Sequence, residues 1–216
     1  MINVDQQINA VERAIGSRPL SAGQARTLTI SQTYDATIDD VWDACTNPER
    51  LPRWFLPVTG DLRPGGHYQL QDNANGTIET CQPPTGFNAT WEFFGEVSWV
   101  EVRLAEIPGG TRLTLEHLAH IDDERWAEFG PGAVGIGWDL TLLGLALHLP
   151  AGVGVAKTDS EAWSTSEEGR DFMSLSSDRW RDASVAAGTD AARAAAAAER
   201  TTAFYTGVPT EDAPAT

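Results

Sequence analysis

Apolar side chains occupy every face of residues 134–149, VGIGWDLTLLGLALHL. Helical spacing puts Trp138, Leu142 and Leu145 on one face, and Leu140, Leu143 and Leu147 on the opposite one. A helix that is hydrophobic all round is buried rather than facing water. Sixteen residues with Asp139 and His148 among them fall short of the about 20 apolar residues that a membrane span needs. We therefore expect a core helix packed on two sides, and no membrane span.

Before this helix the pattern alternates between apolar and polar residues, which predicts strands. Strict alternation at residues 27–34 predicts a first strand, with Leu28, Ile30 and Tyr34 on one face. Short turn sequences such as RPGG at 63–66 then separate further alternating runs. Strands joined by such short turns pair antiparallel, because a parallel crossover takes a dozen or more residues. The runs cover residues 58–62, 67–71, 77–81, 88–94, 97–106 and 111–119.

Short helices are predicted on both sides of this meander. Apolar residues at steps of four, three and four predict an amphipathic helix over residues 4–15 that ends at Gly16. The other predicted helices are one at 40–46 capped by Thr37 or Asp39, one starting at Asn47–Pro48, and a helical turn from Asp122 to Phe129.

The chain beyond Leu149 is polar at first and then rich in alanine. Ser164 and Glu167 have capping-box spacing for a helix that ends at Gly188, and Asp190 caps another helix. We expect these helices to cover the outer face of the buried helix with Phe172, Leu175, Trp180 and Phe204. The alternative is an alanine-rich arm that contacts a second subunit. Residues 208–216 have the composition of a disordered tail.

The chain is acidic, with 31 acidic and 15 basic residues and a formal charge of −16. Such a field repels phosphate backbones, so no nucleic-acid partner is expected. The first residues have neither a basic start nor an apolar block, and a cytoplasmic location is therefore predicted. Cys45 and Cys81 have no CxxC spacing and are interpreted as small buried hydrophobes.

Two motifs suggest cofactors, but their context argues against both. GPGAVG at 130–135 matches G-x-G-x-x-G, yet a helical turn rather than a strand precedes it, so no nucleotide cofactor is expected. His117 and His120 are three apart in a strand and point to opposite faces, so no metal site is expected. No Ser-His-Asp order, nucleophile elbow or redox pair occurs, and no catalytic nucleophile is predicted.

His117 and Asp139 are the two polar residues with an open interpretation. Strand parity turns His117 toward the apolar interior, either as a core histidine with a hydrogen-bond partner or as a ligand or catalytic group. Asp139 lies in the buried helix and either faces the tail or serves a cavity.

Several segments together resemble a known superfamily. They are VWDACTNPERLPRWF at 41–55, GDLRPGG at 60–66, TWEF at 90–93, TRLTLEH at 111–117 and GWDLTLLGLALHL at 137–149. The chain resembles the SRPBCC superfamily, and within it bacterial proteins like the C-terminal domain of the activator of heat-shock protein 90 ATPase. The resemblance covers about residues 25–149 and implies an α+β helix-grip fold, an antiparallel sheet wrapped around the long helix, to which this chain adds a helical C-terminal extension.

This fold implies a division of the chain and an apolar cavity. The expected parts are residues 1–24 as an N-terminal helix and lead-in, 25–149 as the helix-grip domain, 150–207 as a helical extension packed on it, and 208–216 as the tail. The residues expected to bind a ligand between sheet and helix are Trp54, Tyr68, Leu70, Trp91, Phe93, Leu115, His117, Trp138, Leu142 and Leu145.

The leading functional hypothesis is a cytoplasmic protein that holds a small hydrophobic ligand in this cavity. The resemblance also suggests a chaperone-interacting, ATPase-activator-like module. Against that, the family's cochaperones carry a further N-terminal domain, for which the first 24 residues are too few. A third alternative is an enzyme such as a cyclase or hydrolase that uses His117 and Asp139 as acid and base. A homodimer contact is also open.

Overall fold

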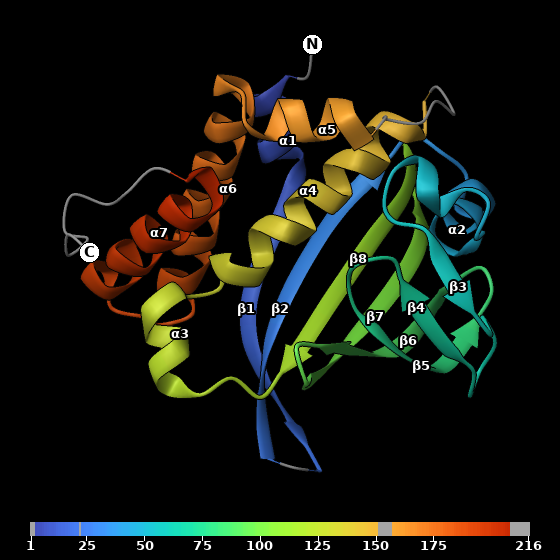
Figure 1. Cartoon of the computed structure of the whole chain (residues 1–216), viewed down its shortest axis with the longest axis horizontal. Coiled ribbons are helices and arrows are strands. Elements are labelled where there is room, and N and C mark those ends of the chain that lie inside the picture. The colour runs from blue at the N-terminus through green and yellow to red at the C-terminus, as the bar shows by residue number, and fades with distance from the viewer. Residues whose placement is uncertain (1–2, 22, 151–156, 208–216) are drawn as a thin grey trace.

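The computed structural model describes residues 3–21, 23–150 and 157–207. One antiparallel sheet of eight strands, in the order β1-β2-β8-β7-β6-β5-β4-β3, packs against the long helix α4 (Gly132–His148), as Figure 1 shows. Further helices lie on the other side of α4. The α+β helix-grip fold with a helical C-terminal extension is thus confirmed.

The predicted meander forms with strand ends that shift by a few residues. The strands are β1 (Val11–Leu20), β2 (Gly23–Tyr34), β3 (Val58–Gly60), β4 (His67–Leu70), β5 (Asn75–Gln82), β6 (Gly86–Phe93), β7 (Glu96–Ile107) and β8 (Gly110–Ala119). The other helices are α1 (Val4–Ala10), α2 (Ile38–Thr46), the 3-10 helix η1 (Leu51–Arg53), α3 (Asp123–Phe129), α5 (Lys157–Ser164), α6 (Glu167–Ala186) and α7 (Ala191–Thr206).

The N-terminal prediction is wrong in its second half. The helix expected over residues 4–15 ends at Ala10, and the chain continues as strand β1, which pairs with β2 from Val11↔Gln32 to Leu20↔Gly23. Val11 and Ile15 suit either structure, because four-residue spacing also keeps two residues on one face of a strand. The β2 edge decides between them, since it offers backbone partners that the isolated segment lacks.

Helix α4 is buried on two sides, as its all-round apolar pattern predicts. Trp138, Leu142 and Leu145 belong to the main core with the sheet. On the opposite side Leu143 packs with Ile8 of α1 and Phe172 of α6 in a second cluster, which the partly buried Leu140 joins.

A glycine in α4 shows how closely the extension approaches. A Cβ atom added to Gly135 would lie 2.3 Å from the Trp180 ring of α6. The indole therefore packs directly on the backbone of α4, and Trp180 is fully buried. This contact requires a residue without a side chain at that position.

The extension covers α4 with some of the residues expected for this role. Phe172 and Trp180 are fully buried, but Phe204 is 78% exposed, because the buried contacts of α7 come instead from the small residues Ala194, Ala197 and Thr201. Leu147 of α4 also remains 38% exposed.

Two helix starts in the extension were predicted, with different outcomes. The N-cap of α6 is Ser166, whose hydroxyl accepts from the Gly169 N–H, and not Ser164, which ends α5. Asp190 caps α7 as predicted. The tail predicted at 208–216 lies outside the described residues.

Within the described ranges, no single helix has both the length and the apolar composition to cross a membrane. The bent pair of α3 and α4 meets these two criteria only when taken together, with a bend of 58°. Most of α4 is buried in protein, and a buried core helix passes the same test.

The division of the chain at residues 24, 149 and 207 stays a prediction, which truncation after Pro150 tests. Removing the following residues exposes the α4 surface covered by Phe172 and Trp180, each worth about 1.5–3 kcal/mol when buried. We expect aggregation or a fall of about 10 °C in melting temperature by differential scanning calorimetry. Truncation after Gly207 is the control. A monomeric fragment ending at Pro150 with the parent melting temperature would contradict the prediction.

Candidate functional site

His117 of β8 lies between the sheet and α4 and is held by two hydrogen bonds. The Trp138 indole N–H of α4 donates to its Nδ1 at 3.0 Å, which leaves the proton of a neutral ring on Nε2. Nε2 lies 2.9 Å from the Ser98 hydroxyl of β7, and that hydroxyl donates to the Trp91 carbonyl at 3.0 Å. Both ring nitrogens are therefore used inside the protein, and His117 joins the helix to the sheet.

Burial determines the charge of this histidine. The side chain is enclosed by Trp91 and Trp138, with ring centroids at 6.3 and 5.8 Å. Loss of water disfavours the charged form and lowers the pKa of His117 from 6.5 to about 4. The imidazole is neutral at physiological pH.

The structure brings most of the expected ligand-binding residues together. Leu115, Trp138, Leu142 and Leu145 lie in the main core, while Tyr68 and Leu70 lie in a smaller cluster with Ala89. Trp91 packs against both clusters and connects them, and Trp54 packs on the main core.

Phe93 is the exception among these residues. Its ring is 40% exposed beside Phe94, with ring centroids 4.3 Å apart, and Phe94 is 93% exposed. Phe93 has the same strand parity as Trp91, but it is the last residue of β6. Phe93 is therefore less enclosed than the other residues expected to bind a ligand, and its role in a ligand site stays a prediction.

Several aromatic side chains on the inner face remain half-buried. Trp42 of α2 meets Phe87 of β6 edge to face at 6.3 Å, and both pack against the main core. Trp54 and Phe55 follow η1 with ring centroids 5.7 Å apart. We call these four residues and Trp91 the aromatic rim.

Phe87 of the aromatic rim is absent from the residues expected for the site. It shares strand parity with Ala89 and Trp91, so the alternation carried the signal. It was missed because the strand was expected to start at residue 88, whereas β6 begins at Gly86.

A second polar group lies inside the fold near α1. Gln7 and Gln32 exchange two side-chain hydrogen bonds of 2.9 and 3.2 Å, and the Tyr34 hydroxyl contacts Gln32 Oε1 and the Leu142 carbonyl, both at 3.3 Å. Burial raises the pKa of Tyr34 well above 10, and it raises the pKa of the Cys45 thiol to about 12. These groups are neutral and offer no activated nucleophile.

Asp139 faces the tail rather than the cavity. Arg13 of β1 donates from Nε and Nη2 to the two carboxylate oxygens at 3.0 and 2.6 Å. The Ser176 hydroxyl and the Trp180 indole of α6 donate to Oδ2 at 2.6 and 2.8 Å. With side chains 4% and 1% exposed, Arg13 and Asp139 form a buried ion pair.

These contacts separate Asp139 from His117. Asp139 binds β1 and α6, whereas His117 binds α4 and β7 through Trp138 and Ser98. The structure does not bring them together as an acid and a base. Arg13 was not anticipated, because the sequence around it was assigned to a helix.

The structure shows where the glycine motif lies and whether any side chains are arranged to bind a metal. Gly130 caps the end of α3 and Gly132 begins α4, so a helix precedes the glycine motif, and every strand pairing among the described residues is antiparallel rather than part of a βαβ unit. Among the described residues, no group of three His, Cys, Asp or Glu side chains is arranged to hold a metal ion.

Comparison with known proteins gives matches at two levels. A family model described as Activator of Hsp90 ATPase homolog 1-like protein matches residues 35–149. CalU16 from Micromonospora echinospora is similar over most of both chains. Its crystal structure is 35% identical, covers 83% of this chain and 99% of that one, and has a TM-score of 0.65. Its solution structure is 38% identical, covers 83% and 97%, and has a TM-score of 0.67.

A more distant structure shares the fold. Protein MLL2253 from Mesorhizobium loti is 21% identical, covers 58% of this chain and 97% of that one, and has a TM-score of 0.52. No curated protein matches.

His117→Gln tests the neutral histidine, because an amide can still accept from Trp138 and donate to Ser98. As the pH falls below 6.5, His117 binds a proton in the unfolded state, whereas in the folded state it stays neutral until about pH 4. The parent should therefore lose on the order of 3 kcal/mol of unfolding free energy between pH 6.5 and 4, a loss absent from the variant. Urea unfolding across this range measures it, with the exposed His120→Gln as control. Parallel pH profiles of parent and His117→Gln would refute the assignment.

Asp139→Asn tests the buried ion pair. The change leaves the Arg13 charge buried without its counterion, and we expect a loss of about 3–5 kcal/mol in urea unfolding. Adding Arg13→Gln should recover part of it, since no unpaired charge remains. Asp182→Asn, at a half-exposed pair with Arg181, is the control and should cost less than about 1 kcal/mol. Equal losses for the two aspartates would contradict this account.

Proposed function

The chain belongs to the Activator of Hsp90 ATPase homolog 1-like family of the SRPBCC superfamily, and on that premise we propose that it binds a small hydrophobic molecule between the sheet and α4. The proposal rests on the partial exposure of the aromatic rim. Its large apolar rings remain half-buried on the inner face of the fold although smaller residues around them are fully buried.

The polar groups near the rim support an uncharged, apolar ligand. His117 is neutral, and its two ring nitrogens are hydrogen-bonded to Trp138 and Ser98. Trp54 donates its indole N–H to the Ala44 carbonyl at 3.0 Å. With these donors already engaged, affinity comes from apolar area and ring contacts. The ligand therefore contacts the rim and the outer parts of Trp138, while Leu142 and Leu145, which are almost fully buried, support it from behind.

A protein-binding role is the second candidate, and the family description favours it. The pair of exposed aromatic side chains at Phe93 and Phe94 offers a surface for such a contact. In this proposal the chain stimulates the ATPase of an Hsp90 partner, which a steady-state ATPase assay with and without Phe94→Ser tests. A cytoplasmic location and a homodimer contact remain predictions.

The ligand proposal is tested with 1-N-phenylnaphthylamine, an uncharged fluorescent probe. We expect saturable binding at one site, weakened about tenfold by Phe87→Ala or Trp91→Ala because each removes a large ring contact. Trp99→Ala is the matched control, since Trp99 is a half-buried tryptophan on β7 that pairs with His120 on the outer face.

Two results would contradict the ligand proposal. The parent would show no saturable probe binding, or Trp99→Ala would weaken binding as much as Trp91→Ala does. Native mass spectrometry of the purified parent adds an independent measurement, in which a retained apolar molecule supports the proposal.

A further inference from the structure

Three of the five rings of the aromatic rim belong to one short stretch of chain. Trp42 lies in α2, and Trp54 and Phe55 follow η1. The other two rings, Phe87 and Trp91, lie in β6 and take their positions from the strand pairings of the sheet. Short helices such as α2 and η1 hold a defined position only through contacts with the rest of the fold. The placement of the first three rings therefore depends on how α2 and η1 are fixed.

Residues 50–54, which we call the docking segment, contact the C-terminal end of α4 at two points. At the first, the Arg50 Nε–H donates to His148 Nε2 at 2.9 Å, and His148 is fully buried. At the second, the backbone of Trp54 lies against Gly144, where an added Cβ atom would be only 2.5 Å from the Trp54 carbonyl oxygen. Residues 144 and 148 are four positions apart, so they lie on the same face of the helix. The docking segment therefore runs along that face in the direction opposite to α4.

Arg50 also binds α2. Its Nη1 atom pairs with the carboxylates of Asp40 at 2.6 Å and Asp43 at 3.0 Å, and it donates to the Asp40 carbonyl at 3.2 Å. The Trp54 indole N–H donates to the Ala44 carbonyl of the same helix at 3.0 Å. One guanidinium thus joins α2, the docking segment and the end of α4. Figure 1 shows α2 near that end of α4.

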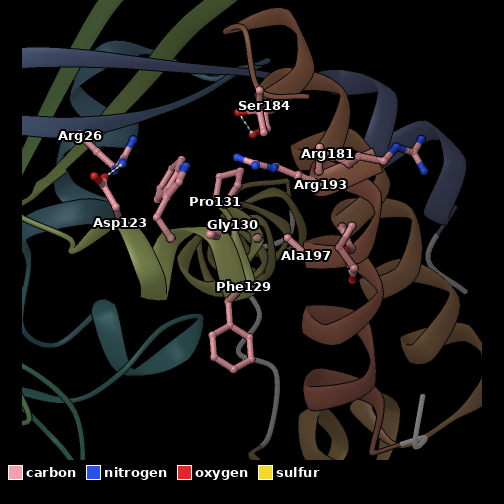
Figure 2. A pocket seen from close by; sticks show the side chains of 16 residues that line it. Arg26, Asp123, Phe129, Gly130, Pro131, Arg181, Ser184, Arg193 and Ala197 are labelled. Carbon is pink, nitrogen blue, oxygen red and sulfur yellow. Dashed lines mark hydrogen bonds and ion pairs between the residues drawn. The ribbon is translucent and has the colours of Figure 1, made fainter. Parts of the chain in front are cut away.

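The opposite end of α4 has different surroundings. A cavity of about 350 Å³ lies there, where the end of α3 and the start of α4 meet α6 and α7, and Figure 2 shows the side chains that line it. None of its described lining residues belongs to the aromatic rim or to the docking segment. This cavity is therefore separate from the contacts that fix the rim.

We propose that the docking segment positions the apolar site, with Arg50 as its positioning residue, an inference that rests on the proposed function. By joining α2 and the docking segment to α4, Arg50 holds the rings of Trp42 and Trp54 in place before a ligand arrives. Arg50 is not itself a member of the aromatic rim, so it acts through these rings. A ligand that meets rings already in place loses less conformational entropy on binding, and its affinity is higher for that reason.

The first test compares two glycines of α4. Gly144→Ala places a methyl group against the Trp54 carbonyl oxygen and displaces the docking segment. Gly137→Ala is the matched control, because its added Cβ would lie 3.6 Å from the Tyr205 hydroxyl, an ordinary contact distance. Alanine suits a helix interior better than glycine, so neither change weakens α4 itself. We expect Gly144→Ala to weaken binding of 1-N-phenylnaphthylamine about tenfold and Gly137→Ala to leave it unchanged.

Arg50→Gln tests the guanidinium itself and should also weaken probe binding about tenfold. In ¹H–¹⁵N NMR of the ligand-free variant, the indole N–H signal of Trp54 should shift or broaden, while that of Trp99 on the outer face stays unchanged. A residue that only stabilises the fold would lower the melting temperature without altering either readout in the folded protein.

Arg112→Gln is the matched control for the arginine, because it removes a guanidinium whose partners, Glu12 and Ser31, belong to β1 and β2. It should leave probe affinity and the Trp54 indole signal unchanged.

The positioning role is overturned if folded Arg50→Gln binds the probe as tightly as the parent, or if Gly137→Ala weakens binding as much as Gly144→Ala does. If Arg50→Gln does not fold, the glycine pair decides. A parent that binds the probe no better than these variants do refutes the positioning role alone, whereas a parent that does not bind the probe refutes the proposed function and this inference with it.

Discussion

The buried carboxylate of Asp139 connects parts of the chain that do not otherwise meet in sequence. It accepts hydrogen bonds from Arg13 on β1 and from Ser176 and Trp180 on α6. Two charges taken out of water cost several kcal/mol each and are tolerated only when geometry and hydrogen bonding are good. Every oxygen of the carboxylate is used, so the edge strand, the core helix and the extension must be placed together.

This arrangement leaves α4 with little free surface. The sheet covers one side through Trp138, Leu142 and Leu145, and α1 with α6 covers the other through Ile8 and Phe172. The proposed ligand therefore contacts the aromatic rim, whose rings are only half-buried. The two ring nitrogens of His117 and the indole N–H of Trp54 are hydrogen-bonded inside the protein, which makes these groups apolar in effect toward a ligand.

The electrostatics of the region between sheet and helix follow from burial. Burial keeps His117, Tyr34 and Cys45 neutral, so these three groups offer no charge that could hold an anion.

Local periodicity determined most of the fold and part of the site. Alternation predicted the meander from β2 to β8, and the all-round apolar run predicted α4, because each pattern is set by neighbouring residues. Strand parity also turned His117 inward. The tertiary structure alone decided that residues 11–20 form a strand, since the partner strand supplies its hydrogen bonds. It also decided that Asp139 pairs with Arg13, 126 positions away, and that Phe93 ends up exposed, because these outcomes depend on which distant elements cover a position.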